Sequence, residues 1–221
     1  MKFPNAAKGV SKIFTAEILS LIALIATGGM AVFSAFLMAL NQPKGELSTG
    51  AVVSAAGVVG FGIIAGILLI IALVFKIVGV VQTAKDEDSF KVIIYLTVLA
   101  IIVALVAACF SGNKFAADVA RVVGDIVTLI CSILIVLGIV NMATKYNNIA
   151  VIEKGGRILK LIILIGIISI IVKFIAIFLP SESAAFLIAV FAVIALILSI
   201  VQYCVYLSFL SNAKKMLNEE L

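Results

Sequence analysis

The 221-residue sequence contains no histidine, no tryptophan and only three cysteines. Without histidine the chain lacks the usual proton relay and the usual imidazole ligand for a metal. Cys109, Cys131 and Cys204 fall within or at the end of apolar runs at unrelated spacings, so they are interpreted as small packing residues and not as a disulfide framework. These absences argue against most enzyme classes, and we expect a protein without enzymatic activity, cofactor or metal.

Charge is also scarce, because only 12% of the residues are charged whereas 65% are apolar. This composition is typical of integral membrane proteins. A helix needs about 20 apolar residues to cross the roughly 30 Å hydrocarbon layer. Six segments meet this requirement: residues 13–40, 51–83, 90–110, 117–144, 157–179 and 184–212. The runs of Ile, Leu and Val lack the alternation of a transmembrane barrel, so an all-α bundle of six transmembrane helices is predicted.

Short polar breaks separate these segments and predict three consecutive helical hairpins, with 1–221 forming a single integral membrane domain and no soluble domain. The longest expected connection runs from Lys145 to Gly156. True internal repetition stays open, since Ile, Val, Leu and Ala are so frequent that chance similarity between spans is high.

Basic residues are distributed unevenly between the two sets of breaks. Of the sixteen Lys and Arg residues, all but Lys44, Lys114, Arg121 and Lys173 fall on the side that holds both termini. The positive-inside rule predicts that this side is cytoplasmic, in a plasma membrane or a bacterial inner membrane. The net charge of +5 is then explained by topology and by contact with anionic lipids at the cytoplasmic face, so nucleic acid is not an expected partner.

Charged residues inside spans are costly unless they are paired or hydrated. Glu17 in the first span and Lys76 in the second lie at matching depths, and we expect them to form an ion pair or water-bridged clamp near the cytoplasmic boundary. The alternative to this contact is that the two side chains extend separately towards the membrane interface.

The fourth span carries a polar ladder that begins at Lys114 and continues in steps of four and three residues to Ser132, which places its members on one helical face. Lys173 of the fifth span is expected to approach Asp125 from the same side. The ladder is interpreted either as a self-neutralising stripe or as a polar outer vestibule that contacts a solute or ion. Alternatively, residues 113–124 lie flat at the interface. The candidate solute-binding or ion-pair residues are Asp118, Arg121, Asp125, Thr128, Ser132 and Lys173.

A second group of polar residues near the cytoplasmic side is predicted to be either an anchoring belt or the lining of an inner cavity. It consists of Gln82, Asn141, Gln202, Tyr203 and Tyr206.

Two functions follow from these patterns. The first is a structural or accessory subunit of a membrane assembly, which packs against a membrane-protein partner or against itself. The second is a small-solute transporter, or the membrane-embedded solute-binding subunit of one. The number and length of the spans are similar to those of the six-span substrate-capture subunits of vitamin importers, although no motif matches.

Overall fold

In the computed structural model, the described part of the chain consists of α-helices and the turns between them and contains no strand. The backbone is described for residues 3–40, 49–110, 112–178 and 181–219, and the side chains for 3–27, 60–110, 112–113, 115–174, 198 and 200–218. The predicted all-α class is therefore confirmed for these residues. The helices are α1 Pro4–Leu40, α2 Thr49–Thr83, α3 Ser89–Cys109, α4 Lys114–Lys145, α5 Ile149–Phe178 and α6 Ser181–Glu219.

Several of these helices are suited to a bilayer. Within the described residues, five segments are long and apolar enough to cross a membrane: Pro4–Thr27, Gly60–Thr83, Ser89–Cys109, Phe115–Lys145 and Ile149–Phe174. Much of the sixth predicted span, residues 184–212, lies outside the residues whose side chains are described. The chain thus has the helices of a multi-pass membrane protein.

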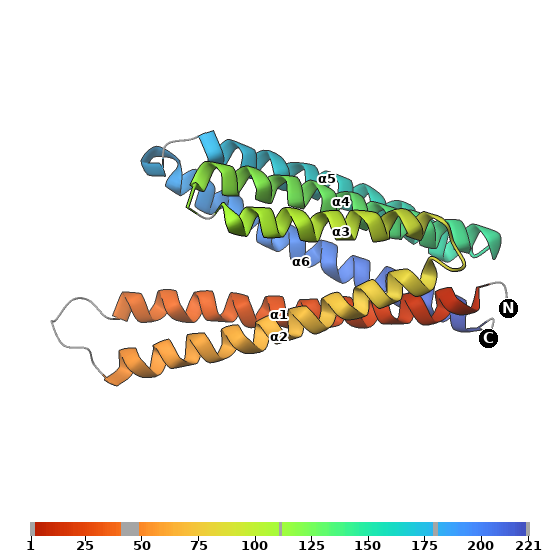
Figure 1. Cartoon of the computed structure of the whole chain (residues 1–221), viewed down its shortest axis with the longest axis horizontal. Helices are drawn as coiled ribbons and strands as arrows, with labels where there is room; N and C mark the ends of the chain where they lie inside the picture. The colour runs from red at the N-terminus through yellow and green to blue at the C-terminus, as the bar shows by residue number, and fades with distance from the viewer. Residues whose placement is uncertain (1–2, 41–48, 111, 179–180, 220–221) are drawn as a thin grey trace. The chain divides into compact units, whose positions relative to one another are not determined.

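The chain forms two compact units. One comprises residues 1–11 and 79–221, and the other residues 12–78. In the first unit, α3 packs on α4, α4 on α5 and α5 on α6, while α4 also touches α6 (Figure 1). Consecutive helices are therefore neighbours here, as short connections favour.

Glycines set the register of the helices within the first unit. On α4, Gly138 lies against Phe90 and Gly124 lies near Val103, so α3 and α4 run antiparallel. On α5, Gly155 lies against Val140 and Gly166 against Leu129, which gives α4 and α5 the same antiparallel relation. Close approach at small residues is how helices associate when lipid competes for their apolar faces. The fully buried side chains at these contacts include Phe90, Ile135, Ile139, Met142, Ile158 and Phe209.

The connection between α4 and α5 is much shorter than predicted, because α5 already begins at Ile149. Asn147 supplies a left-handed backbone (φ 56°), and the Asn148 side chain accepts a hydrogen bond from the Val151 N–H (3.1 Å), which caps the new helix. The Gly155-Gly156 pair, which the sequence places at the end of this connection, lies inside α5. Gly155 is required there by packing, since it faces Val140 and Phe209.

The two adjacent glycines should respond in opposite ways to alanine. In Gly155→Ala the new Cβ would overlap Val140 and lie 3.2 Å from Phe209, so we expect a loss of about 1 kcal/mol or more of stability. In Gly156→Ala the new Cβ meets nothing within 4 Å, and removal of a helical glycine should stabilise by up to about 1 kcal/mol. Thermal unfolding in detergent measures both, and equal shifts would contradict the packing described.

Candidate functional site

The polar ladder lies on one unbroken helix. Asn113 caps α4 by accepting a hydrogen bond from the Ala116 N–H (3.2 Å), and the helix then continues to Lys145. Residues 114–124 are thus the first turns of the same helix as the apolar run that follows. A separate helix lying flat at the interface would require a break after residue 124, and the structure has none there.

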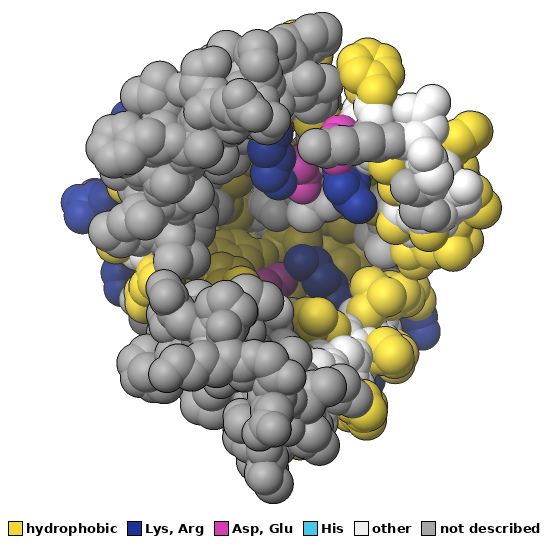
Figure 2. All heavy atoms as spheres, turned by 90° about the vertical axis from the view of Figure 1, so that its left-hand side faces the viewer, with side chains coloured by type: hydrophobic (Ala, Val, Ile, Leu, Met, Phe, Trp, Pro, Cys, Tyr) yellow, Lys and Arg dark blue, Asp and Glu magenta, His cyan; other side chains and the backbone are white. Residues whose placement is uncertain are grey.

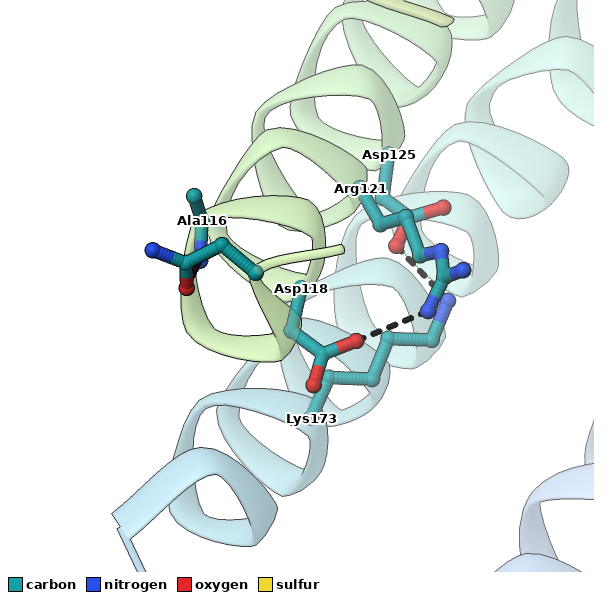
Figure 3. A network of polar contacts seen from close by, with 6 residues as sticks. Ala116, Asp118, Arg121, Asp125 and Lys173 are labelled. Carbon is teal, nitrogen blue, oxygen red and sulfur yellow. Dashed lines mark hydrogen bonds and ion pairs between the residues drawn. The ribbon is translucent and has the colours of Figure 1, made fainter. Parts of the chain in front are cut away.

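The charged members of the ladder form two ion pairs, one within α4 and one between helices (Figure 3). Arg121 Nη1 lies 2.8 Å from Asp118 Oδ1, and Lys173 Nζ of α5 lies 2.7 Å from Asp125 Oδ2. The Lys173 and Asp125 side chains nevertheless keep 54% and 39% of their surface exposed. Each pair is neutral overall, but both leave polar atoms accessible.

Thr128 and Ser132 do not join this charged network. Thr128 Oγ1 donates to the Gly124 carbonyl oxygen (2.9 Å) and Ser132 Oγ donates to the Thr128 carbonyl oxygen (3.0 Å). Both hydroxyl protons are committed to α4, so these side chains can offer a ligand only acceptor lone pairs. The ladder thus has two parts. One consists of charged side chains with exposed polar atoms, and the other, further along α4, consists of two hydroxyl groups that can only accept hydrogen bonds from a ligand.

The charged part gathers on one face of the molecule. Figure 2 shows Lys or Arg side chains (dark blue) next to Asp or Glu side chains (magenta) on the face that is turned to the viewer. Asp118, Arg121, Asp125 and Lys173 sum to no net charge. Because its net charge is zero, such a cluster attracts neither anions nor cations in general. A ligand that carries both a positive and a negative group could pair with the carboxylates and with the cationic side chains at once.

The contact between α4 and α5 predicts the outcome of a charge-reversal experiment. Asp125→Lys would place two ammonium groups together, and we expect it to reduce the folded protein recovered from membranes by several-fold. Lys173→Asp added to it restores an opposite pair and should return most of the yield. Fluorescence-detected size exclusion measures this, and failure of the double variant to recover would argue against direct pairing.

The second unit contains the predicted clamp. Lys76 Nζ lies 2.7 Å from Glu17 Oε1, so the expected contact is a direct ion pair. The Glu17 side chain is only 6% exposed, whereas Lys76 retains 34%. Depth matching along the two helices was sufficient to predict this pair. Its burial indicates that it holds α1 against α2.

The five residues proposed to line an inner cavity do not share one environment. Asn141 is exposed on α4, while Tyr206 on α6 is buried. Gln82, near the end of α2, has a buried Oε1 atom without a hydrogen-bond partner in the described structure. Gln202 and Tyr203 are half-buried on α6. An inner cavity formed by these residues remains a prediction.

Sequence reasoning missed a polar network that joins the connections at the opposite end from the ladder. The Asp86 carboxylate accepts hydrogen bonds from the backbone N–H groups of Asn5 (2.7 Å) and Ala6 (2.8 Å), and from Asn5 Nδ2 (2.9 Å). Asp86 thereby caps α1 from a distant part of the chain, where a carboxylate also suits the positive end of the helix dipole. In the sequence, the acidic run Asp86-Glu87-Asp88 is the feature that could have indicated this network.

The neighbouring residues extend this network. Glu87 Oε2 lies 2.8 Å from Lys145 Nζ, and Lys145 also lies 5.2 Å from the centre of the Phe3 ring, which stacks edge-on against Tyr146. At the exposed Asp88, the hydrogen bond and the charge of Lys91 hold the pKa of the carboxyl below its ordinary value. The α2–α3 connection is thus fixed both to the start of α1 and to the end of α4.

Within the described residues, no group of three or more His, Cys, Asp or Glu side chains is placed to hold a metal ion. The ladder offers carboxylate, guanidinium and ammonium groups, which recognise charged ligands through ion pairs and hydrogen bonds. Comparisons of the chain with protein-family models, curated proteins and solved structures return no match.

Proposed function

We propose that the chain is a non-enzymatic, multi-pass integral membrane protein that serves as a structural or accessory subunit of a membrane assembly. The observation that carries this proposal is the apolar surface of its helices. Ile70 on α2, Leu105 on α3 and Leu164 on α5 each expose more than half of their surface, and many Ile, Leu and Val residues around them do the same. Such a surface is stable only against lipid or another apolar protein.

The proposal includes the finer topology. Six helices span the membrane as three hairpins in one membrane domain, both termini face the cytoplasm, and the membrane is a plasma membrane or a bacterial inner membrane. The lysine and arginine bias supports this orientation, with anionic lipids at the basic face. Single cysteines in a background without the three native ones, labelled with a membrane-impermeant maleimide, test it. Labelling from outside at position 3 or 218 would contradict the orientation.

The accessory role also predicts a defined oligomeric state or a stable complex. A subunit of an assembly should be extracted in a mild detergent or in native nanodiscs as a particle of defined stoichiometry, either with a second membrane protein or as a homo-oligomer. Mass photometry of the extracted particle measures this. A monomer that catalyses solute uptake in vesicles would contradict the proposal.

A second candidate function is solute binding in a polar vestibule, and the exposed Asp125–Lys173 pair favours it. Neutral, similarly shaped substitutions test it: Asp125→Asn, Arg121→Gln and Lys173→Met. The folded wild-type protein and each variant would be screened against small charged solutes by thermal shift. If every variant retains every ligand response of the wild type, the vestibule does not bind the solute.

A further inference from the structure

Charged residues on α5 lie too close together for an ordinary bilayer. Lys160 and Lys173 are both exposed, and the thirteen-residue step between them covers only about 20 Å of helix. The hydrocarbon layer is roughly 30 Å thick. One of the two charged positions must therefore lie within the depth that hydrocarbon normally occupies.

Helix α3 provides a scale for the depth of these positions. The contacts of Gly138 with Phe90 and of Gly155 with Val140 place Lys91 of α3 and Arg157 of α5 at about the same level. Basic residues of both helices thus mark one boundary. From this level α3 continues without charge from residue 92 to 110, about 28 Å, which is close to a full hydrocarbon thickness.

The same register gives the depth of the ion pair between α4 and α5. Gly124 lies near Val103, so Asp125 is level with residues about two turns before the end of α3 at Cys109. Asp125 consequently lies about 10 Å below the boundary that the end of α3 defines, and the backbone of its partner Lys173 lies about 5 Å below it. Asp118 is two turns nearer that boundary. The ladder therefore descends from the surface into the hydrocarbon layer.

At this depth the pair is not enclosed by protein, because the Lys173 and Asp125 side chains keep 54% and 39% of their surface exposed. A charge exposed to acyl chains costs at least about 2.5 kcal/mol, and mutual pairing offsets only part of that cost when both groups keep open hydrogen-bonding positions. Polar groups of the surroundings must therefore reach the ladder. The only polar groups that a bilayer itself supplies are the headgroups of its lipids and the water that accompanies them.

We propose that the ladder is a membrane-embedded site for zwitterionic phospholipid headgroups, which enter the hydrocarbon layer along α4 beside α5. Charge complementarity supports this occupant. Arg121 and Lys173 suit a phosphate, and Asp118 and Asp125 suit the ammonium of choline or ethanolamine. An anion alone would meet two carboxylates as well. The inference rests on the proposed membrane-spanning function and adds a ligand class to it.

The absence of tryptophan from the chain makes a direct test possible. Thr128→Trp places a fluorescent reporter on the ladder face, one turn deeper than Asp125. Ile130→Trp is the matched control: it lies only about 3 Å further along α4 but about 200° around it, and Ile130 is 41% exposed among apolar neighbours. Neither substitution removes a member of the two ion pairs.

Both variants would be reconstituted in phosphatidylcholine vesicles that contain lipid with a nitroxide on its headgroup or, separately, bromine on its acyl chain. We expect headgroup nitroxide to quench the reporter at 128 several-fold more strongly than the one at 130, and acyl bromine to quench mainly the latter. Asp125→Leu combined with Lys173→Met should make the reporter at 128 behave like that at 130.

Each alternative result has a distinct meaning. Equal quenching at both positions, with strong acyl-bromine quenching of the control, would overturn the headgroup site while leaving the membrane-spanning proposal intact. Quenching at 128 by aqueous acrylamide but not by headgroup nitroxide would also overturn it, in favour of a water-filled crevice. A control that acyl bromine does not quench would overturn the membrane-spanning proposal itself.

Discussion

Lys76→Met should destabilise the protein by about 3 kcal/mol, because it leaves the buried Glu17 carboxylate without the ammonium group that now lies 2.7 Å away. Removing one partner of a buried pair costs more than the pair contributes, since the remaining charge is poorly solvated. The estimate is at the low end of the usual range because a third of the Lys76 side chain is exposed. Chemical unfolding in mixed micelles, followed by circular dichroism, measures the change.

Two companion variants separate charge from shape. Lys76→Arg keeps the positive charge and should retain most of the stability. Glu17→Gln added to Lys76→Met removes the carboxylate charge as well, and it should recover most of what the single substitution loses. A Lys76→Met protein within about 0.5 kcal/mol of the wild type would mean that the clamp contributes little.

Gly9→Ala should produce the second large loss, about 2 to 3 kcal/mol, by forcing apart two helices that meet backbone to backbone. A Cβ at position 9 of α1 would overlap Thr83 Oγ1 and approach the Gly79 carbonyl oxygen to 2.5 Å and the Thr83 nitrogen to 2.8 Å. A flexible side chain could turn away, but backbone atoms in a helix cannot. Thr83 is also fully buried, with its hydroxyl donating to the Gly79 carbonyl oxygen (2.9 Å).

The control for this substitution is Gly66→Ala on α2, where a new Cβ meets nothing within 4 Å. It should leave the unfolding free energy unchanged or raise it by up to about 1 kcal/mol through helix propensity. The same detergent unfolding assay compares the two variants. A similar loss in both would point to a general intolerance of the transmembrane helices to alanine and not to close approach at Gly9.

The contacts that could be predicted from the sequence are those governed by depth and helical period. Glu17 and Lys76 match because each lies a similar distance from the same turn between the first two helices, and a charge in hydrocarbon has few other ways to be stabilised. Asp125 and Lys173 follow from the same argument. In an apolar chain charged residues are rare, so the number of possible partners is small.

Other features could not be predicted, because they depend on tertiary packing that leaves no local pattern. By composition Gly155 is typical of a helix end, and only the positions of Val140 and Phe209 explain why glycine is needed inside α5. Asp86 caps a helix that begins about eighty positions earlier, and its partners are backbone N–H groups that every residue carries. Sequence spacing contains no information on such a pairing.

The membership of the first compact unit has a consequence for synthesis. Residues 1–11 are synthesised before residues 79–221, yet they belong to the same compact unit, and their α1 cap, Asp86, is made only after the second helix is complete. A nascent chain that stops within α2 therefore has an unfinished first turn and an uncovered Val10. Residues 1–11 therefore cannot complete their packing until the later residues of their unit are made, and we expect truncated translation products to be recognised by membrane quality control.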